Sequence, residues 1–436
     1  MINIFLILNM NSNLFHVEIV QKRNSVAKKS FIVDAVKGFI SNYSSITPGV
    51  TIHNHEFEEN PNLSEHVECI LFCDMEQDSE VVGTEANFVY HVYTLDTFGV
   101  ETDTMTDTAS GEELSAADVW ALPAEEFHGL WESLVFDSEL KEDLLKFVET
   151  AFEFADLRVD PNVISWNRVV LLHGPPGTGK TSLCRALAQK LAIRLGDRFP
   201  RARLIEINAH GLFSKWFSES GKLVAKLFDR IREIVDDPKM LACVLVDEVE
   251  SLAHARRAAL AGLEPSDSIR AVNAILTQLD RLKRYPNALV LTTSNVTGAI
   301  DVAFVDRADI KRHVGPPSER AAYEILRGCC TELMTRGVVA PRERLFALRV
   351  LEAARFADTE GSRASLRLWA AARAAAAHSI SGRALRRLPF LARALYSGAR
   401  PPLLQFIEAL HAALTGHLAD ASDLEKNDLS LVTSGH

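Results

Sequence analysis

Hydrophobic and polar positions change their period along the chain, and the pattern is clearest between residues 168 and 314. Short apolar runs typical of buried strands alternate there with longer stretches in which apolar residues recur every three or four positions, as in helices. The runs predict strands over residues 168–173, 203–208, 242–247, 288–293 and 310–314, and the stretches predict helices over residues 180–195, 221–235, 249–261 and 266–282. This alternation predicts a parallel sheet with helices on both faces.

The flanking regions have different patterns. Residues 319–336 and the Ala-, Leu- and Arg-rich stretches after them predict a separate helical lid. Near the N-terminus, short β-like runs (residues 2–8, 31–33, 67–72 and 88–93) accompany one predicted helix over residues 34–42. The predicted organisation is a small α/β domain for binding or targeting (1–100), an acidic linker rich in Asp, Glu, Thr and Ser (101–126), a large α/β domain (127–316) and a small helical lid domain (317–436).

Composition narrows the class of protein. The 436 residues carry a formal net charge of −11, and a protein that neutralises many phosphates needs a basic face, so direct nucleic-acid binding is not expected. Among six cysteines, only Cys69 and Cys73 have a loosely metal-like spacing. Because no second pair completes a zinc site, buried or free thiols are expected. No apolar run approaches the ~20 residues that cross a bilayer, so we expect no membrane partner and a cytosolic or nuclear location.

The strongest chemical signal is a glycine-rich loop between the first predicted strand of the large domain and the helix after it. Its sequence matches the phosphate-binding pattern G-x-x-x-x-G-K-[ST], in the strand–loop–helix context that the pattern requires. Glycines allow backbone N–H groups to surround phosphate oxygens, and the helix N-terminus adds partial positive charge. Lys180 is expected to reach the β- and γ-phosphates of ATP, and Thr181 to offer its hydroxyl to Mg²⁺. The candidate nucleotide-binding residues are Gly174, Pro175, Pro176, Gly177, Thr178, Gly179, Lys180, Thr181 and Ser182.

Two further elements end the third and fourth predicted strands of this domain. The apolar run Cys243–Val246 leads into Asp247 and Glu248. Asp247 is expected to hold the Mg²⁺ shell, and Glu248 to act as general base on the attacking water. Asn295 follows Thr292-Thr293-Ser294, where an amide can hydrogen-bond the γ-phosphate or that water. Taken alone, such an Asn is better interpreted as a helix N-cap or turn residue, but its order and spacing after the other two elements favour the functional role.

These three elements, in this order, resemble the AAA+ family of ATPases. The stretch Phe127–Leu134, the residues around Trp216 and Glu248, and the segments Ile300–Ile310 and Ser381–Phe390 resemble more specifically the pachytene checkpoint protein 2 branch of that family. The match extends over roughly residues 127–410 and is weaker in the first 100 residues. The resemblance implies a P-loop sheet flanked by helices, a helical lid, an N-terminal substrate-recognition domain, and assembly into a homohexameric ring.

The resemblance also implies a function. Members of this branch use ATP to convert HORMA-domain proteins of the meiotic chromosome axis and the spindle checkpoint from a closed to an open form, often with a HORMA-like adaptor. Expected locations are therefore the nucleus, on chromosomes, and the cytoplasm. The resemblance further implies that Arg307 is an arginine finger for the neighbouring subunit's ATP, and that Arg383 is a sensor arginine at the start of a lid helix. A second trans arginine has no assigned position.

Trp216 and Phe217 are the candidate pore residues. They follow the second predicted strand in a setting of Ser, Lys and Glu, which suits a loop better than a core. Aromatic rings in a pore can grip an extended peptide without sequence choice, because they offer a large apolar area at low entropic cost. The alternative is a packed aromatic pair in the core. Residues 256–270 are the candidate second pore loop.

Two other classes of function remain open at this level. A nucleic-acid-dependent AAA+ motor would show DNA-stimulated hydrolysis, although the acidic charge opposes it. A nucleotide-gated scaffold on chromosome-axis proteins would hydrolyse ATP without opening them.

Overall fold

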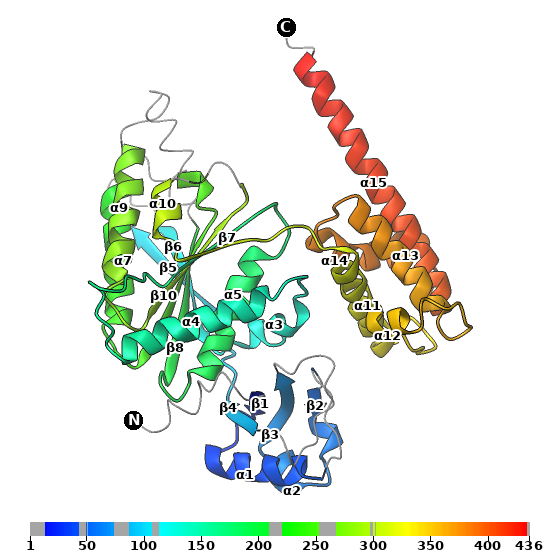
Figure 1. Ribbon diagram of the computed structural model, residues 1–436, viewed down its shortest axis with the longest axis horizontal. Coiled ribbons are helices and arrows are strands. Elements are labelled where there is room, and N and C mark those ends of the chain that lie inside the picture. Colours follow the sequence, from blue (N-terminus) through cyan, green and yellow to red (C-terminus); the bar gives the residue numbers. More distant parts are fainter. Residues whose placement is uncertain are drawn as a thin grey trace.

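The computed structural model describes most of the chain, and its architecture is shown in Figure 1. The described residues are 14–42, 49, 51–73, 87–106, 113–208, 220–252, 267–296, 300 and 302–433. The candidate pore residues Trp216 and Phe217, the predicted strand over residues 2–8, and most of the second candidate pore loop lie outside these ranges. Within the described part, no helix is both long and apolar enough to span a membrane.

A seven-stranded sheet forms the large domain, in the order β11-β7-β10-β9-β8-β6-β5. The five strands from β11 to β8 are parallel, while β6 pairs antiparallel with β8 and β5 antiparallel with β6. The sheet is thus mixed: the predicted parallel part extends from the edge strand β11 to β8, and the two antiparallel strands form the opposite edge. Its strands are β5 (Val100–Thr106), β6 (Glu113–Leu122), β7 (Val169–His173), β8 (Arg201–Asn208), β9 (Met240–Asp247), β10 (Ala288–Ser294) and β11 (Ile310–His313).

Helices cover both faces of this sheet, as the continuous apolar runs predict. Strand β9 shows why, because successive side chains point to opposite faces: Val244 and Val246 join one core, and Cys243 and Leu245 the other. The first core is covered by α7 (Ser220–Val235), α9 (Asp267–Leu282) and α10 (Val302–Arg307). The second core is covered by α3 (Leu130–Ser133), α4 (Leu140–Asp156) and α5 (Lys180–Arg194).

The C-terminal helices form the predicted lid around their own core. Buried residues of α15, among them Phe406 and Leu410, pack against the other lid helices, and the end of α15 projects away from the body (Figure 1). The lid consists of α11 (Glu319–Thr335), α12 (Leu348–Ala353), α13 (Arg363–Ala377), α14 (Gly382–Leu391), the π-helical turn η3 (Ala392–Tyr396) and α15 (Leu403–Thr433).

The N-terminal domain is a four-stranded sheet of order β2-β3-β1-β4, with α1 on one face. It lies beside the end of the large domain that carries α5 (Figure 1). The apolar cluster that joins β1, β3 and β4 to α5 includes Val20, Leu71 and Ile193. Its elements are β1 (Leu14–Gln21), α1 (Lys29–Ile40), β2 (Thr51–His53), the short turns η1 (Asn54–Glu56) and α2 (Pro61–Ser64), β3 (Val67–Cys73) and β4 (Asn87–Tyr93); η2 (Glu125–Phe127) precedes α3.

Two predictions about the N-terminal third are wrong. Residues 101–126 are not a linker, since β6 pairs with β8 and β5 pairs with β6, which adds two strands to the sheet of the large domain. A polar sequence suits an edge strand such as β5, because one edge of it faces solvent. The predicted strand over residues 31–33 is instead the first turn of α1, where Ile32, Val36 and Ile40 are buried at helical spacing.

Candidate functional site

The glycine-rich loop connects β7 to α5 at the carboxyl end of the parallel strands. The backbone N–H of Gly174 donates to the carbonyl oxygen of Ser294, 3.1 Å away at the end of β10. The Lys180 ammonium opens α5 and donates to the carbonyl oxygens of Gly174 (2.8 Å) and Pro175 (2.7 Å). Burial lowers its pKa, and the carboxylates of Glu250 and Asp247 oppose that effect. A buried cation is thus held inside the loop, where phosphate oxygens would accept its hydrogen bonds.

The glycines of the loop are required by geometry at two positions. Gly174 has a φ of +144°, and a Cβ there would lie 2.2 Å from the carbonyl oxygen of Val314. Gly177 has a φ of +77°, and its Cβ would lie 2.9 Å from Oγ of Ser381 in the lid. Because only glycine combines positive φ with such close approach, the loop keeps its backbone accessible to a phosphate.

The residues predicted to hold Mg²⁺ lie together at the end of β9. The Thr181 hydroxyl is 3.0 Å and 3.2 Å from the two carboxylate oxygens of Asp247. Asp247 also accepts a hydrogen bond from the Thr293 hydroxyl on β10. A hydroxyl and a carboxylate beside a phosphate loop are the hard oxygen ligands that Mg²⁺ prefers, so this donor set fits a nucleotide-bound magnesium ion.

Glu248 and Asn295 come together as the sequence predicts. Asn295 Nδ2 donates to Glu248 Oε1 at 3.3 Å, and the backbone N–H of Asn295 donates to Glu250 Oε1 at 3.1 Å. The backbone N–H of Glu248 donates to the Thr293 hydroxyl at 3.3 Å. Glu248 has a φ of +57°, which is uncommon for a residue other than glycine and clusters at functional sites. The backbone of β9 therefore turns sharply where it delivers this carboxylate.

The lid brings Arg383 to the same site. Its backbone N–H donates to the carbonyl oxygen of Gly177 at 2.9 Å, so the first turn of α14 contacts the tip of the phosphate loop. Ser381 caps α14, with its hydroxyl accepting from the N–H of Ala384. The Arg383 charge also contributes, after burial, to lowering the pKa of Lys180. A movement of the lid would therefore move a cation relative to the bound phosphates.

Arg307 is not part of its own subunit's nucleotide site. Its carbonyl oxygen accepts a hydrogen bond from Asn167 Nδ2 at 3.1 Å, beside the start of β7, whereas the phosphate loop begins at Gly174 beyond the end of that strand. Seven residues of extended chain separate Asn167 from Gly174, which is roughly 23 Å at ~3.3 Å per residue. An arginine side chain cannot span that distance, so Arg307 does not reach the phosphate loop of its own chain.

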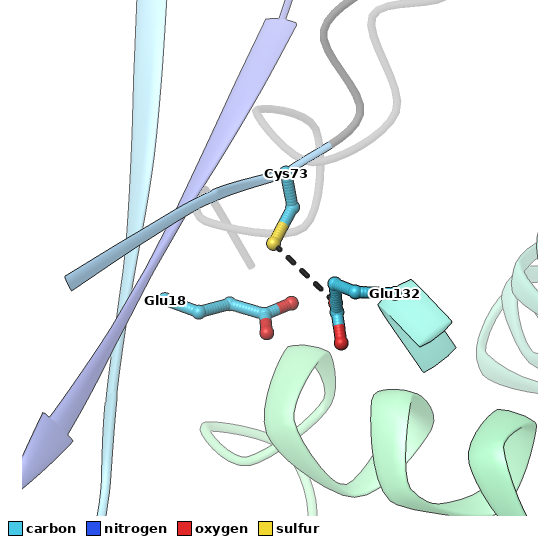
Figure 2. Close-up of side chains that lie close together, drawn as sticks. All are labelled: Glu18, Cys73 and Glu132. Atoms are coloured by element: carbon cyan, nitrogen blue, oxygen red, sulfur yellow. Dashed lines mark hydrogen bonds between the residues drawn. The ribbon is translucent and has the colours of Figure 1, made fainter. Parts of the chain in front are cut away.

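A second cluster of metal-ligand types lies between the N-terminal domain and α5. Glu18 on β1, Cys73 on β3 and Glu132 on α3 converge, with one ligand atom of each within 4.8 Å of the others (Figure 2). The Lys190 ammonium lies 2.7 Å from both carboxylates and 3.4 Å from Cys73 Sγ. Burial, then the charge of Glu18, raise the pKa of Cys73 to about 12, so the thiol stays protonated. The cation of this cluster is therefore Lys190, and the cluster is a structural junction.

Three residues that contact the predicted site residues were not themselves predicted as site residues. Thr293 joins Asp247 to Glu248, Glu250 holds the backbone of Asn295, and Asp280 forms a two-point contact with Arg307. Thr293 and Glu250 lie within or beside motifs that were recognised in the sequence, so their positions could have indicated a role at the site. Asp280 had no such signal, because it is one of many acidic residues on a helix surface.

Comparisons with known proteins agree with this architecture. The family model for the ATPase family associated with various cellular activities (AAA) matches residues 170–316, the TRIP13-like AAA+ ATPase lid C-terminal domain matches residues 318–418, and the TRIP13 N-terminal domain matches residues 10–98.

Similar proteins span nearly the whole chain. The pachytene checkpoint protein 2 homolog of Danio rerio is 46% identical over 410 residues, which are 94% of this chain and 95% of the relative. The Homo sapiens homolog is 48% identical over 404 residues, 92% of each chain. The solved structure of C. elegans PCH-2 matches with a TM-score of 0.75 and 33% identity, covering 93% of this chain and 100% of that chain.

Proposed function

Because this chain belongs to the pachytene checkpoint protein 2 family of AAA+ ATPases, we propose that it uses ATP hydrolysis to convert HORMA-domain proteins from a closed to an open form. The chain is an ATPase; its substrate and the direction of remodelling are the proposed part. The observation that carries the proposal is the assembled hydrolytic centre, in which Glu248, Asn295 and the lid residue Arg383 converge on one phosphate loop.

The residues divide the work of hydrolysis as follows. Backbone N–H groups of the loop and Lys180 bind the β- and γ-phosphates. Thr181 and Asp247 would hold Mg²⁺, which when bound would neutralise charge on the phosphate oxygens. Asn295 orients the attacking water, and Glu248 accepts a proton from that water. The bond from the γ-phosphorus to the bridging oxygen breaks as the water oxygen attacks, leaving ADP and phosphate.

The proposed function also requires assembly into a ring and contact with the substrate. The chain works as a homohexamer, with Arg307 facing the nucleotide of the neighbouring subunit, since it cannot reach its own. Trp216 and Phe217 grip the substrate in the pore, and the N-terminal domain receives the HORMA protein, with or without a HORMA-like adaptor. Because the proposed substrates belong to the meiotic axis and the spindle checkpoint, we expect the protein to act on chromosomes in the nucleus and in the cytoplasm.

The test is ATP turnover by the purified chain with and without a closed HORMA-domain protein, alongside Glu248→Gln and Trp216→Ala. We expect substrate-stimulated hydrolysis and conversion of the substrate to its open form. Glu248→Gln should bind ATP and trap the substrate, while Trp216→Ala should hydrolyse ATP without converting it.

Other outcomes would favour other functions. Hydrolysis that leaves the HORMA protein closed would support a nucleotide-gated scaffold. Stimulation by DNA in place of the HORMA protein would support a nucleic-acid motor.

A further inference from the structure

The guanidinium of Arg307 is held by an acidic residue of its own subunit. Arg307 Nε donates to Asp280 Oδ1 at 3.0 Å and Nη2 donates to Oδ2 at 2.7 Å, so the carboxylate takes one whole edge of the planar group. The remaining terminal nitrogen, Nη1, donates to the carbonyl oxygen of Ala303, one turn earlier on α10, at 2.7 Å. Two independent acceptors thus define the plane of the guanidinium.

The backbone of Arg307 is fixed as well. Asn167 Nδ2 donates to its carbonyl oxygen. The carboxylate of Asp309 accepts hydrogen bonds from the N–H groups of Asn167 (2.9 Å) and Val169 (3.1 Å), which ties the end of α10 to β7. Asp280 lies on α9, so the contact with Arg307 crosses from one helix to the next. The side chain of Arg307 is 26% exposed and that of Asp280 is 40% exposed, so the pair lies at the surface.

We propose that Asp280 is the positioning residue of Arg307, holding its guanidinium in the orientation that meets the ATP of the neighbouring subunit. The inference rests on the proposed role of Arg307 as the trans arginine. An unrestrained arginine side chain samples many rotamers, and a bidentate carboxylate removes that freedom before the neighbouring nucleotide binds. A transition state is stabilised most by donors already in place when charge develops.

The charge state of Asp280 suits this task. Partial burial acts to raise its pKa, but hydrogen bonds from Arg307 and Lys283 outweigh the burial, so the pKa of Asp280 is lowered. The carboxylate is therefore ionised throughout the neutral range. Lys283 Nζ also lies 2.8 Å from Asp280 Oδ1, and it offers a control contact that does not involve Arg307.

A double-mutant cycle separates positioning from a general structural role. The variants are Asp280→Asn, Arg307→Ala and the two together, assayed for kcat and KM of ATP hydrolysis in assembled rings. Asparagine keeps the shape but offers one acceptor where aspartate offers two. We expect Asp280→Asn to lower kcat about tenfold, a fraction of the 10³–10⁵ that a complete arginine finger supplies, with little change in KM. In the Arg307→Ala background the same substitution should change kcat less than twofold.

Lys283→Met is the matched control. It removes the other partner of Asp280 from the same carboxylate, and kcat should stay within twofold of the unmodified protein. If Asp280→Asn lowers kcat by the same factor with and without Arg307, the two residues act independently and the proposal is wrong. If Arg307→Ala itself hydrolyses ATP normally, the proposed role of Arg307 fails, which is a different result from the loss of coupling.

Mixed rings test whether Asp280 acts across the subunit boundary. Asp280→Asn subunits keep an intact hydrolytic centre, and Glu248→Gln subunits keep an intact Arg307 and Asp280. Each junction in a ring is head-to-tail, so it pairs the hydrolytic centre of one subunit with Arg307 of the next. In an equal mixture, about a quarter of the junctions therefore combine the intact centre of an Asp280→Asn subunit with the intact Arg307 and Asp280 of a Glu248→Gln subunit. Activity above the average of the two separate variants is expected. Activity equal to that average would place the defect of Asp280→Asn in its own subunit and overturn the proposal.

Discussion

Replacing Lys190 by Met tests the junction between the N-terminal domain and the ATPase. Lys190 lies on α5, the helix that begins at the phosphate loop, and its ammonium is 2.7 Å from Glu18 Oε1 on β1 and from Glu132 Oε1 on α3. The side chains of Lys190 and Glu18 are each 2% exposed. Burial acts to lower the pKa of Lys190, but the charges of Glu18 and Glu132 reverse the effect and raise it well above its usual value. The ammonium is therefore permanently charged, and methionine removes the charge at similar length.

The size of the expected loss in stability depends on which carboxylate is left without its partner. Removing one member of a buried ion pair costs about 3–5 kcal/mol, because the other charge stays buried and uncompensated. Glu132 is 37% exposed, so water screens it after the substitution. Glu18 is fully buried and bears most of the cost, although the nearby Arg194 charge offsets part of it. We expect a loss of about 3 kcal/mol in the free energy of opening the junction, close to a 10²-fold change in that equilibrium.

Amide hydrogen exchange is the assay, because it reports local opening separately from global unfolding. Exchange over β1 and α3 should accelerate by about 10²-fold in Lys190→Met, while the central strands of the large sheet keep their protection. The matched control is the double variant Lys190→Met with Glu18→Met. It replaces the buried charges by apolar groups and should recover most of the lost protection.

Two results would refute the reasoning. Unchanged exchange in Lys190→Met would mean that the ion pairs contribute nothing to docking of the domain. A double variant that opens as readily as Lys190→Met would mean that the unpaired Glu18 charge is not the source of the cost.

Three further predictions concern the loop, the lid and acidification. Gly174→Ala should weaken ATP binding at least about tenfold in a titration, because its Cβ would meet a backbone oxygen, whereas Gly328→Ala in α11, where nothing lies within 4 Å, should bind normally. Arg383→Ala should keep ATP binding but lower kcat about 10²-fold, the loss typical of one transition-state donor; unchanged turnover would exclude the sensor role. Burial, then the charges of Arg194, His91 and Lys190, lower the pKa of His16 to about 2. In the unfolded chain the imidazole takes up a proton below about pH 6.5, whereas in the folded chain it stays neutral. The free energy of unfolding should therefore fall on acidification from about pH 7.5 to about pH 5.5. His16→Gln should reduce that loss in chemical denaturation by about 1.4 kcal/mol, and an unchanged pH profile would show that His16 is not its source.

Sequence alone determined the ATPase centre and the central sheet. The loop Gly174–Thr181, the pair Asp247-Glu248 and Asn295 are recognisable because each lies at the end of a buried apolar strand, and parallel strands end at one edge of a sheet. Local patterns of this kind depend on neighbours within a few residues, so they can be read along the chain. The helical lid was predicted from its local pattern, whereas the role of Arg383 was predicted only from the family resemblance; the structure places Arg383 at the loop.

Only the tertiary structure decided which distant residues meet. Strands β5 and β6 form in the polar region over residues 101–126 because β8 pairs with β6 and β6 pairs with β5, and the local sequence does not show these hydrogen-bonding partners. The contacts of Lys190 with Glu18, and of Arg307 with Asp280, join residues on separate elements, and nothing in the spacing of charges along the chain selects those partners. Local propensity determines elements, whereas the pairing of edges and buried charges depends on how the finished elements pack.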